Sequence, residues 1–264
     1  AAKRFVLQED GLKEIAGCSV IAKYQSMERL IAQVLEEYAL DGSCGSVERR
    51  GKTRTRLVSF YSPDRHRGQS VAALGAAQVL AEDGDQVLYL SMMPFAGFEE
   101  LLQTEYDADV TDFMYFVLNH SEKLLCKLDS IKRSIRGVDY LPPALDYEDL
   151  VAIDRKDWET VADLLLYSSD YTYIVIDLSE TCKGFYDLLE SSDQVYLLTD
   201  SDSVCGRAML SHFRHLLRAK EWDGILARTV EFELPPNWER QCGMLENLAA
   251  SPVGICMKGV LGRR

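Results

Sequence analysis

The residues best suited to chemistry lie in one short stretch between an apolar run and a helix of small residues. Guanidinium groups suit phosphate recognition, and the first turn of a helix presents amide groups to an anion. The stretch carries Arg65, Arg67, Gly68, Gln69 and Ser70 in that order. A strand, a loop and a helix in succession are typical of a phosphate-binding loop, so we predict that these residues meet an anionic ligand. For the two arginines, the alternative is that they are solvated loop residues.

A second candidate is Asp177, which ends the apolar run Tyr173–Asp177. A carboxylate there could hold a metal-bound water, and the hydroxyl of Ser70 could ligate Mg²⁺ if Mg-ATP binds. Both residues also have a structural alternative. Ser70 could simply start a helix, and Asp177 could cap a loop. Between Pro63 and Ser70 there is one glycine and no lysine, which is unusual for a loop that binds phosphate.

The apolar pattern indicates the elements that must position these residues. Leu57–Tyr61 is predicted to be a buried strand, which Ser62-Pro63 ends. A helix is predicted from about Gly68 to Asp83-Gly84, where glycine can adopt the left-handed conformation. Because Leu57–Tyr61 and Tyr173–Asp177 are apolar on both faces, we expect both near the centre of a parallel sheet.

Strands and helices alternate along the rest of the chain. Further strands are predicted from Val87, at 194–199 and at 224–228, and helices at 98–103, 111–118, 158–166, 184–189 and 203–220. This alternation favours an α/β fold, a three-layer sandwich with a central, mainly parallel sheet of about seven strands.

Residues 56–97 resemble the start of the MinD/ParA family of deviant P-loop ATPases, whose loop reads K-G-G-x-G-K-[ST]. Gly68 and Ser70 match that pattern, and Tyr173–Asp177 matches the family's Walker B strand with its aspartate kept. The resemblance continues more weakly to about residue 260, and its detail is similar to the pilus-assembly branch (TadZ/CpaE-like). It implies a P-loop NTPase-like fold and a site for ATP and Mg²⁺.

The residues that the family uses for catalysis are largely replaced. Asp64 and Gln69 stand where the family pattern has two lysines. Arg65 and His66 replace two of its glycines, and Ser91 and Met93 replace two of its aspartates. Two like unit charges 4 Å apart repel by roughly 1–4 kcal/mol, so we expect Asp64 to repel the phosphates. The resemblance therefore implies a pseudoenzyme, a localisation or assembly factor with weak ATP affinity and no turnover. The alternative is an ATP-binding switch in which arginines replace the lysines.

The domain organisation has three predicted parts. Residues 1–40 contain two short apolar runs and one amphipathic stretch, too little to bury a core, and resemble the C-terminal part of a receiver-like domain. Residues 41–55 are rich in glycine, serine and charge and are predicted to be a linker. Residues 56–264 form the MinD/ParA-like domain. We expect any homodimer to form without nucleotide.

The composition limits the classes of partner and the kinds of site that we expect. The net charge of −13 repels polyphosphate backbones, so we expect protein partners of an assembly or positioning system and no general nucleic-acid binding. Seven scattered cysteines without a C-x-x-C pair argue against a disulfide framework and against a zinc site. No apolar run approaches the ~18 residues that a membrane span needs. We expect a cytoplasmic protein.

Overall fold

The computed structural model of the protein describes residues 5–8, 18–24, 30, 33–34, 54–241 and 245–263. Its core is one sheet of seven strands. In spatial order these are β5 (Arg133–Ile135), β6 (Val138–Tyr140), β4 (Val87–Ser91), β7 (Tyr173–Asp177), β3 (Arg56–Tyr61), β8 (Gln194–Leu198) and β9 (Thr229–Phe232). Every neighbouring pair is parallel except β5 and β6. The predicted mainly parallel sheet of an α/β fold is confirmed.

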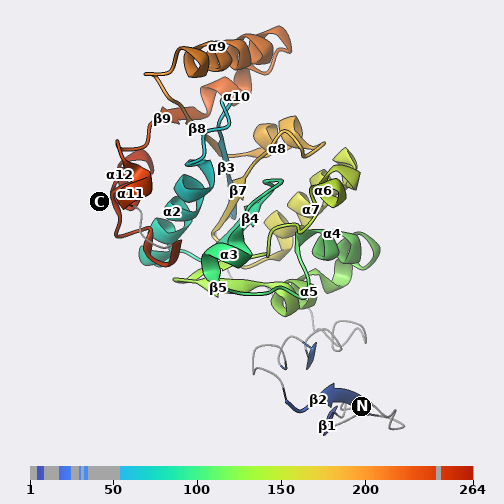
Figure 1. The fold of residues 1–264 in the computed structure, drawn as a ribbon. Coiled ribbons are helices and arrows are strands. Elements are labelled where there is room, and N and C mark those ends of the chain that lie inside the picture. Colours follow the sequence, from blue (N-terminus) through green and yellow to red (C-terminus); the bar gives the residue numbers. More distant parts are fainter. Residues whose placement is uncertain are drawn as a thin grey trace.

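Helices cover both faces of this sheet. In chain order the helical elements are α2 (Gln69–Glu82), α3 (Phe98–Leu102), α4 (Val110–Asn119), η1 (Ser121–Lys123), α5 (Leu124–Ile131), α6 (Tyr147–Ala152), α7 (Arg155–Ser168), α8 (Phe185–Ser191), α9 (Val204–Ala219), α10 (Asp223–Ala227), α11 (Trp238–Gln241), η2 (Leu245–Asn247) and α12 (Pro252–Val260). Figure 1 shows α2, α11 and α12 on one side of the sheet and α4 to α8 on the other. Among the described residues, none of the helices has the length and apolar character required to cross a lipid bilayer.

The two strands predicted at the centre lie there. β3 sits between β7 and β8, and β7 sits between β3 and β4. Five of the six β3 residues are buried, as expected for a strand covered by helices on both faces. In the register, Phe60 and Ser91 both pair with Asp177. The carboxyl ends of β3, β4 and β7 therefore meet at Asp177.

Helix α2 is held between the sheet and the C-terminal segment. Its middle is buried on every side, which small residues permit. The Gln78 side chain donates to the Leu245 carbonyl at 2.8 Å and accepts from the amides of Leu248 and Ala249 at 2.8 and 3.2 Å. Beyond it, Val253 of α12 packs against Gly75. The helix that follows the candidate loop is therefore fixed in place by residues far along the chain.

One predicted strand is wrong. Residues 224–228 do not form a strand, because Asp223–Ala227 is helix α10 and the strand follows at Thr229–Phe232. A short apolar run fits a buried helical turn as well as a strand, and here Ile225 is the buried residue of the turn. Cys126 is disulfide-bonded, whereas Cys18, Cys182, Cys205 and Cys256 are free. Spacing along the sequence says nothing about cysteines that the fold brings together.

The N-terminal part contains β1 (Phe5–Gln8) and β2 (Ser19–Ala22), which pair in parallel as a separate two-stranded sheet. The two strands coincide with the two short apolar runs of residues 1–40. Most of residues 25–53 lie outside the described residues. The receiver-like assignment of residues 1–40 and the linker at 41–55 therefore stay predictions.

Candidate functional site

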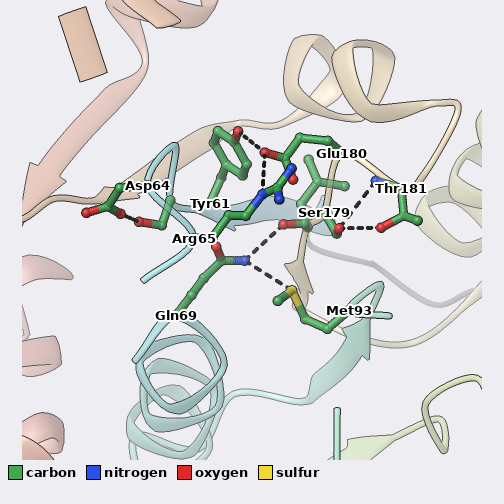
Figure 2. Close-up of polar contacts among 10 residues, drawn as sticks. Tyr61, Asp64, Arg65, Gln69, Met93, Ser179, Glu180 and Thr181 are labelled. Atoms are coloured by element: carbon green, nitrogen blue, oxygen red, sulfur yellow. Dashed lines mark hydrogen bonds and ion pairs between the residues drawn. The ribbon is translucent and has the colours of Figure 1, made fainter. Parts of the chain in front are cut away.

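The candidate site is a cavity of about 560 Å³ at the carboxyl ends of β3, β4 and β7. In parallel α/β sheets this edge is where ligands bind. Its walls are formed by Tyr61, Ser62, Arg65, Gln69, Met93, Pro94, Phe95, Tyr147, Leu178, Ser179, Glu180 and Thr181. Figure 2 shows the loop after β3 and the loop after β7 facing each other across it.

The side chain of Gln69 occupies the base of this cavity. Its Nε2 donates to Asp177 Oδ1 at 2.6 Å and to the Leu178 carbonyl at 2.9 Å. The same nitrogen lies 3.7 Å from Met93 Sδ (Figure 2). The residue is almost entirely buried. The side-chain amide of Gln69 is therefore hydrogen-bonded to the C-terminal end of β7, and it brings no positive charge to the site.

Asp177 is fully buried, and its described donors are neutral. Oδ2 accepts from the Tyr89 hydroxyl at 3.1 Å, while Ser70 and Gln69 also hydrogen-bond the carboxylate. Burial raises the pKa of Asp177 to about 6, and these three hydrogen bonds lower it only partly. The structure thus brings Gln69, Ser70 and Asp177 together, in a network of hydrogen bonds within the protein.

Arg65 lies in the cavity wall with a left-handed backbone, φ +56°. Its Nε lies 3.8 Å from Glu180 Oε1, an oxygen that also accepts from the Tyr61 hydroxyl at 2.8 Å (Figure 2). Sequence reasoning missed Glu180 and Tyr61. The only signal was position, because Glu180 follows the end of β7 by three residues and Tyr61 ends β3. Arg65 is thus directed to a carboxylate at the rim of the cavity.

Arg67 and Gly68 face the C-terminal segment. Arg67 Nη2 pairs with Glu239 Oε1 of α11 at 2.9 Å, and Arg67 does not line the cavity. The Gly68 amide donates to His66 Nδ1 at 3.0 Å. A Cβ atom at Gly68 would lie 2.2 Å from Leu234 Cδ1 and 3.1 Å from Trp238. The loop amide is therefore already bonded, and the two apolar side chains, which sequence reasoning missed, cover it.

Asp64 points away from the cavity, which differs from the expectation that it would face a ligand. Its Oδ1 accepts from the Ser62 hydroxyl at 2.6 Å, and its Oδ2 lies beside Gly206 in the first turn of α9. Figure 2 shows the carboxylate directed to the side opposite Met93. The N-terminal end of a helix attracts negative charge, which explains this direction. Asp64 therefore adds little repulsion at the site.

The residues present do not fit a nucleotide triphosphate with its magnesium ion. Gln69 fills the base of the loop, His66 holds one loop amide, and Arg65 is the single basic side chain among the described residues that line the cavity. Within the described part of the chain, no three His, Cys, Asp or Glu side chains come together as metal ligands would.

We predict that Arg65→Gly raises the free energy of unfolding by about 0.5–1 kcal/mol, because glycine tolerates positive φ. The ion pair lost with Glu180 is exposed and contributes little. Arg67→Gly is the matched control, since Arg67 has no positive φ, and it is expected to lower stability slightly. Urea denaturation of the three proteins measures both changes. Equal losses in both variants would show that the backbone at residue 65 is unstrained.

Comparison with known proteins places the fold. No protein-family model matches the sequence, and no curated protein matches it. Among solved structures, the chain is similar to a ParA family ATPase from Chlorobium tepidum TLS, with 20% identity and a TM-score of 0.55 over 79% of this chain and 82% of that one. It is also similar to a plasmid partition protein from Borrelia burgdorferi B31 bound to AMPPNP, with 16% identity and a TM-score of 0.56 over 80% and 98%. The chain is similar as well to the MinC:MinD cell division protein complex of Aquifex aeolicus, with 14% identity and a TM-score of 0.52 over 80% of this chain and 79% of that one. These likenesses show a ParA/MinD-type fold.

Proposed function

We propose that the protein is a non-catalytic member of the ParA/MinD-type ATPases that acts as a localisation or assembly factor through its surfaces. The observation that carries this proposal is the contact between Gln69 Nε2 and Asp177 Oδ1 at 2.6 Å. In the family pattern, a lysine stands at position 69 and contacts phosphate. Here a neutral amide stands there, and it is bonded to the carboxylate that would serve the metal.

The energetic consequence is large. Each charge-assisted contact to phosphate contributes roughly 1.5–3 kcal/mol, so losing two lysines lowers nucleotide affinity by a few powers of ten. The Gly68 amide is already bonded to His66 Nδ1 at 3.0 Å, so a phosphate would have to compete for this donor. Phosphoryl transfer depends on positioning and charge neutralisation, and the described cavity wall provides one arginine for both.

The kind of role follows from the resemblance and from one neighbour. The Aquifex aeolicus structure is a MinC:MinD complex, in which a protein of this fold assembles with another protein. We propose protein partners of the same general kind for this chain, in a pilus-assembly or cell-positioning system of the cytoplasm. A homodimer, where it forms, would not depend on nucleotide.

Mg-ATP is expected neither to be hydrolysed nor to stabilise the protein. A ligand at 100 times its Kd adds about 2.7 kcal/mol to the apparent stability of the native state, an effect that a thermal-shift titration detects. Phosphate release at saturating Mg-ATP measures turnover. The positive control restores the family residues together, as Asp64→Lys, Arg65→Gly, His66→Gly, Gln69→Lys and Ser91→Asp, and is expected to regain nucleotide binding.

The opposite result is equally specific. Turnover comparable with that of an active ParA-type ATPase, abolished by Ser70→Ala, would contradict the proposal. Arg65 at the cavity wall favours the second candidate, an ATP-binding switch ATPase with an atypical P-loop. In that case Mg-ATP would stabilise the protein, and Arg65→Ala would remove the stabilisation while Arg67→Ala would not.

A further inference from the structure

An exposed apolar surface lies beside the cavity. Phe95 is 85% exposed, Leu145 is 82% exposed and Tyr147 is 41% exposed, and the rings of Phe95 and Tyr147 lie 5.9 Å apart between centroids. We call these three residues the Phe95 patch. Phe95 follows β4, and the other two residues lie at the start of α6. Gathered exposed apolar side chains of this size mark interaction sites, whereas single ones are ordinary.

The patch separates two hollows. The cavity of about 560 Å³ lies on one side, and a second cavity of about 330 Å³ lies on the other. Pro94 and Phe95 line both. Phe95 therefore forms a ridge with space on either side, a shape into which the apolar side chains of a partner can pack.

The second cavity is acidic. Among its described lining residues there is no lysine, arginine or histidine, while five carboxylates contribute to it, namely Glu99, Glu100, Asp107, Asp109 and Asp112. Four of them, Glu99, Glu100, Asp107 and Asp112, are exposed. A polar rim of one charge around an apolar centre selects partners of the opposite charge.

The backbone under the patch is fixed. Asp109 Oδ1 accepts from the Thr111 amide at 2.7 Å, and Asp112 Oδ2 accepts from the Asp109 amide at 3.0 Å. Together these two hydrogen bonds cap the N-terminus of α4. Asp109 Oδ2 also accepts from the Leu145 amide at 3.0 Å. The loop that carries Leu145 is thus tied to the start of α4. A surface ordered in advance binds a partner at lower entropic cost.

We propose that the Phe95 patch and its acidic rim bind a partner protein that presents a basic, amphipathic segment. The inference rests on the proposed function and names the surface through which it acts. Charge complementarity selects the partner. A two-fold contact between copies would bring the same carboxylates together, and an anionic lipid surface would be repelled by them.

The test uses a fluorescently labelled helical peptide with Leu and Phe on one face and Lys on the other, titrated with the full chain in anisotropy. Phe95→Ser is expected to weaken binding by at least about tenfold, the effect of losing one buried aromatic contact. Glu99→Lys with Glu100→Lys should weaken it as well, and added salt should do the same. Ile255→Ser is the matched control, since Ile255 is 67% exposed on α12, and it should bind as the unaltered protein does.

Two outcomes would overturn the inference. One is a peptide affinity that Phe95→Ser leaves unchanged, or equal binding of a matched peptide with Glu in place of Lys. The other is a dimer in sedimentation that Phe95→Ser converts to monomer, because the occupant is then a second copy. Hydrolysis of Mg-ATP alongside specific peptide binding would reject the non-catalytic role and keep the surface. If Mg-ATP is not hydrolysed and the peptide does not bind, the surface would be rejected and the non-catalytic role kept.

Discussion

Replacing Asp177 by asparagine is expected to raise the free energy of unfolding by about 2–3 kcal/mol at about pH 7.5, although the residue is fully buried and hydrogen-bonded. Burial raises the pKa of Asp177 from an ordinary value of 3.8 to about 6. At neutral pH the native protein therefore keeps a charge that it holds less favourably than water does. The amide of asparagine can keep the contacts with Gln69 and Tyr89, because its oxygen accepts from Gln69 and its NH₂ donates to the Tyr89 oxygen.

The contribution of Asp177 to stability depends on pH. Between about pH 4 and pH 6 the native state binds more protons at Asp177 than the unfolded state, so this residue lowers stability as the pH rises through that window. The difference between Asp177→Asn and the unaltered protein should therefore shrink almost to zero at about pH 4. Urea denaturation at both pH values measures it. A variant that is less stable at neutral pH, by an amount independent of pH, would show that the carboxylate is stabilised by more than Gln69, Ser70 and Tyr89.

Replacing Gly254 by alanine is expected to lower the free energy of unfolding by about 3 kcal/mol. The added Cβ would lie 2.2 Å from the Ala249 carbonyl oxygen and 2.4 Å from that of Leu248, and backbone atoms cannot move aside as a side chain can. Gly259 in the same helix is the control, since nothing lies within 4 Å of a Cβ there. Gly259→Ala should gain about 0.5–1 kcal/mol from helix propensity.

Thermal and urea denaturation of the Gly254→Ala and Gly259→Ala variants measure these two changes in the free energy of unfolding. Similar melting temperatures would mean that the turn from Leu248 to Ala249 relaxes around the methyl group. A large loss confined to Gly254→Ala would instead show that this turn is tightly held. Because α12 packs on α2, the loss should extend to the loop that α2 follows.

The fold could be predicted further than the site. Leu57–Tyr61 and Tyr173–Asp177 are apolar at nearly every position, a pattern typical of the buried centre of a parallel sheet, and both lie there. Residues 224–228 could not be assigned in the same way, because three apolar residues between polar ones fit a helical turn and a strand equally well. Packing on neighbouring elements decides such a segment.

At the site, the positions were predictable and the directions of the side chains were not. Gln69, Ser70 and Asp177 meet because strand and helix ends converge in this topology. The contact of Gln69 with Asp177 depends on the space left at the end of β4, and the turn of Asp64 toward α9 depends on a helix end 140 residues away in the sequence. Leu234 and Trp238 cover Gly68 without any periodic pattern that would place them there.

The position of β3 between β7 and β8 also determines when the central sheet can form during synthesis. Leu57 pairs with Ile174 and Val58 with Gln194, so each contact joins positions well over a hundred residues apart. At roughly 5–20 residues per second, a ribosome needs about 6–24 s to add the 117 residues between Arg56 and Tyr173. For that time this central, largely apolar strand has no partner on either side in the growing chain. During its synthesis, this protein should therefore depend on chaperones that hold such segments.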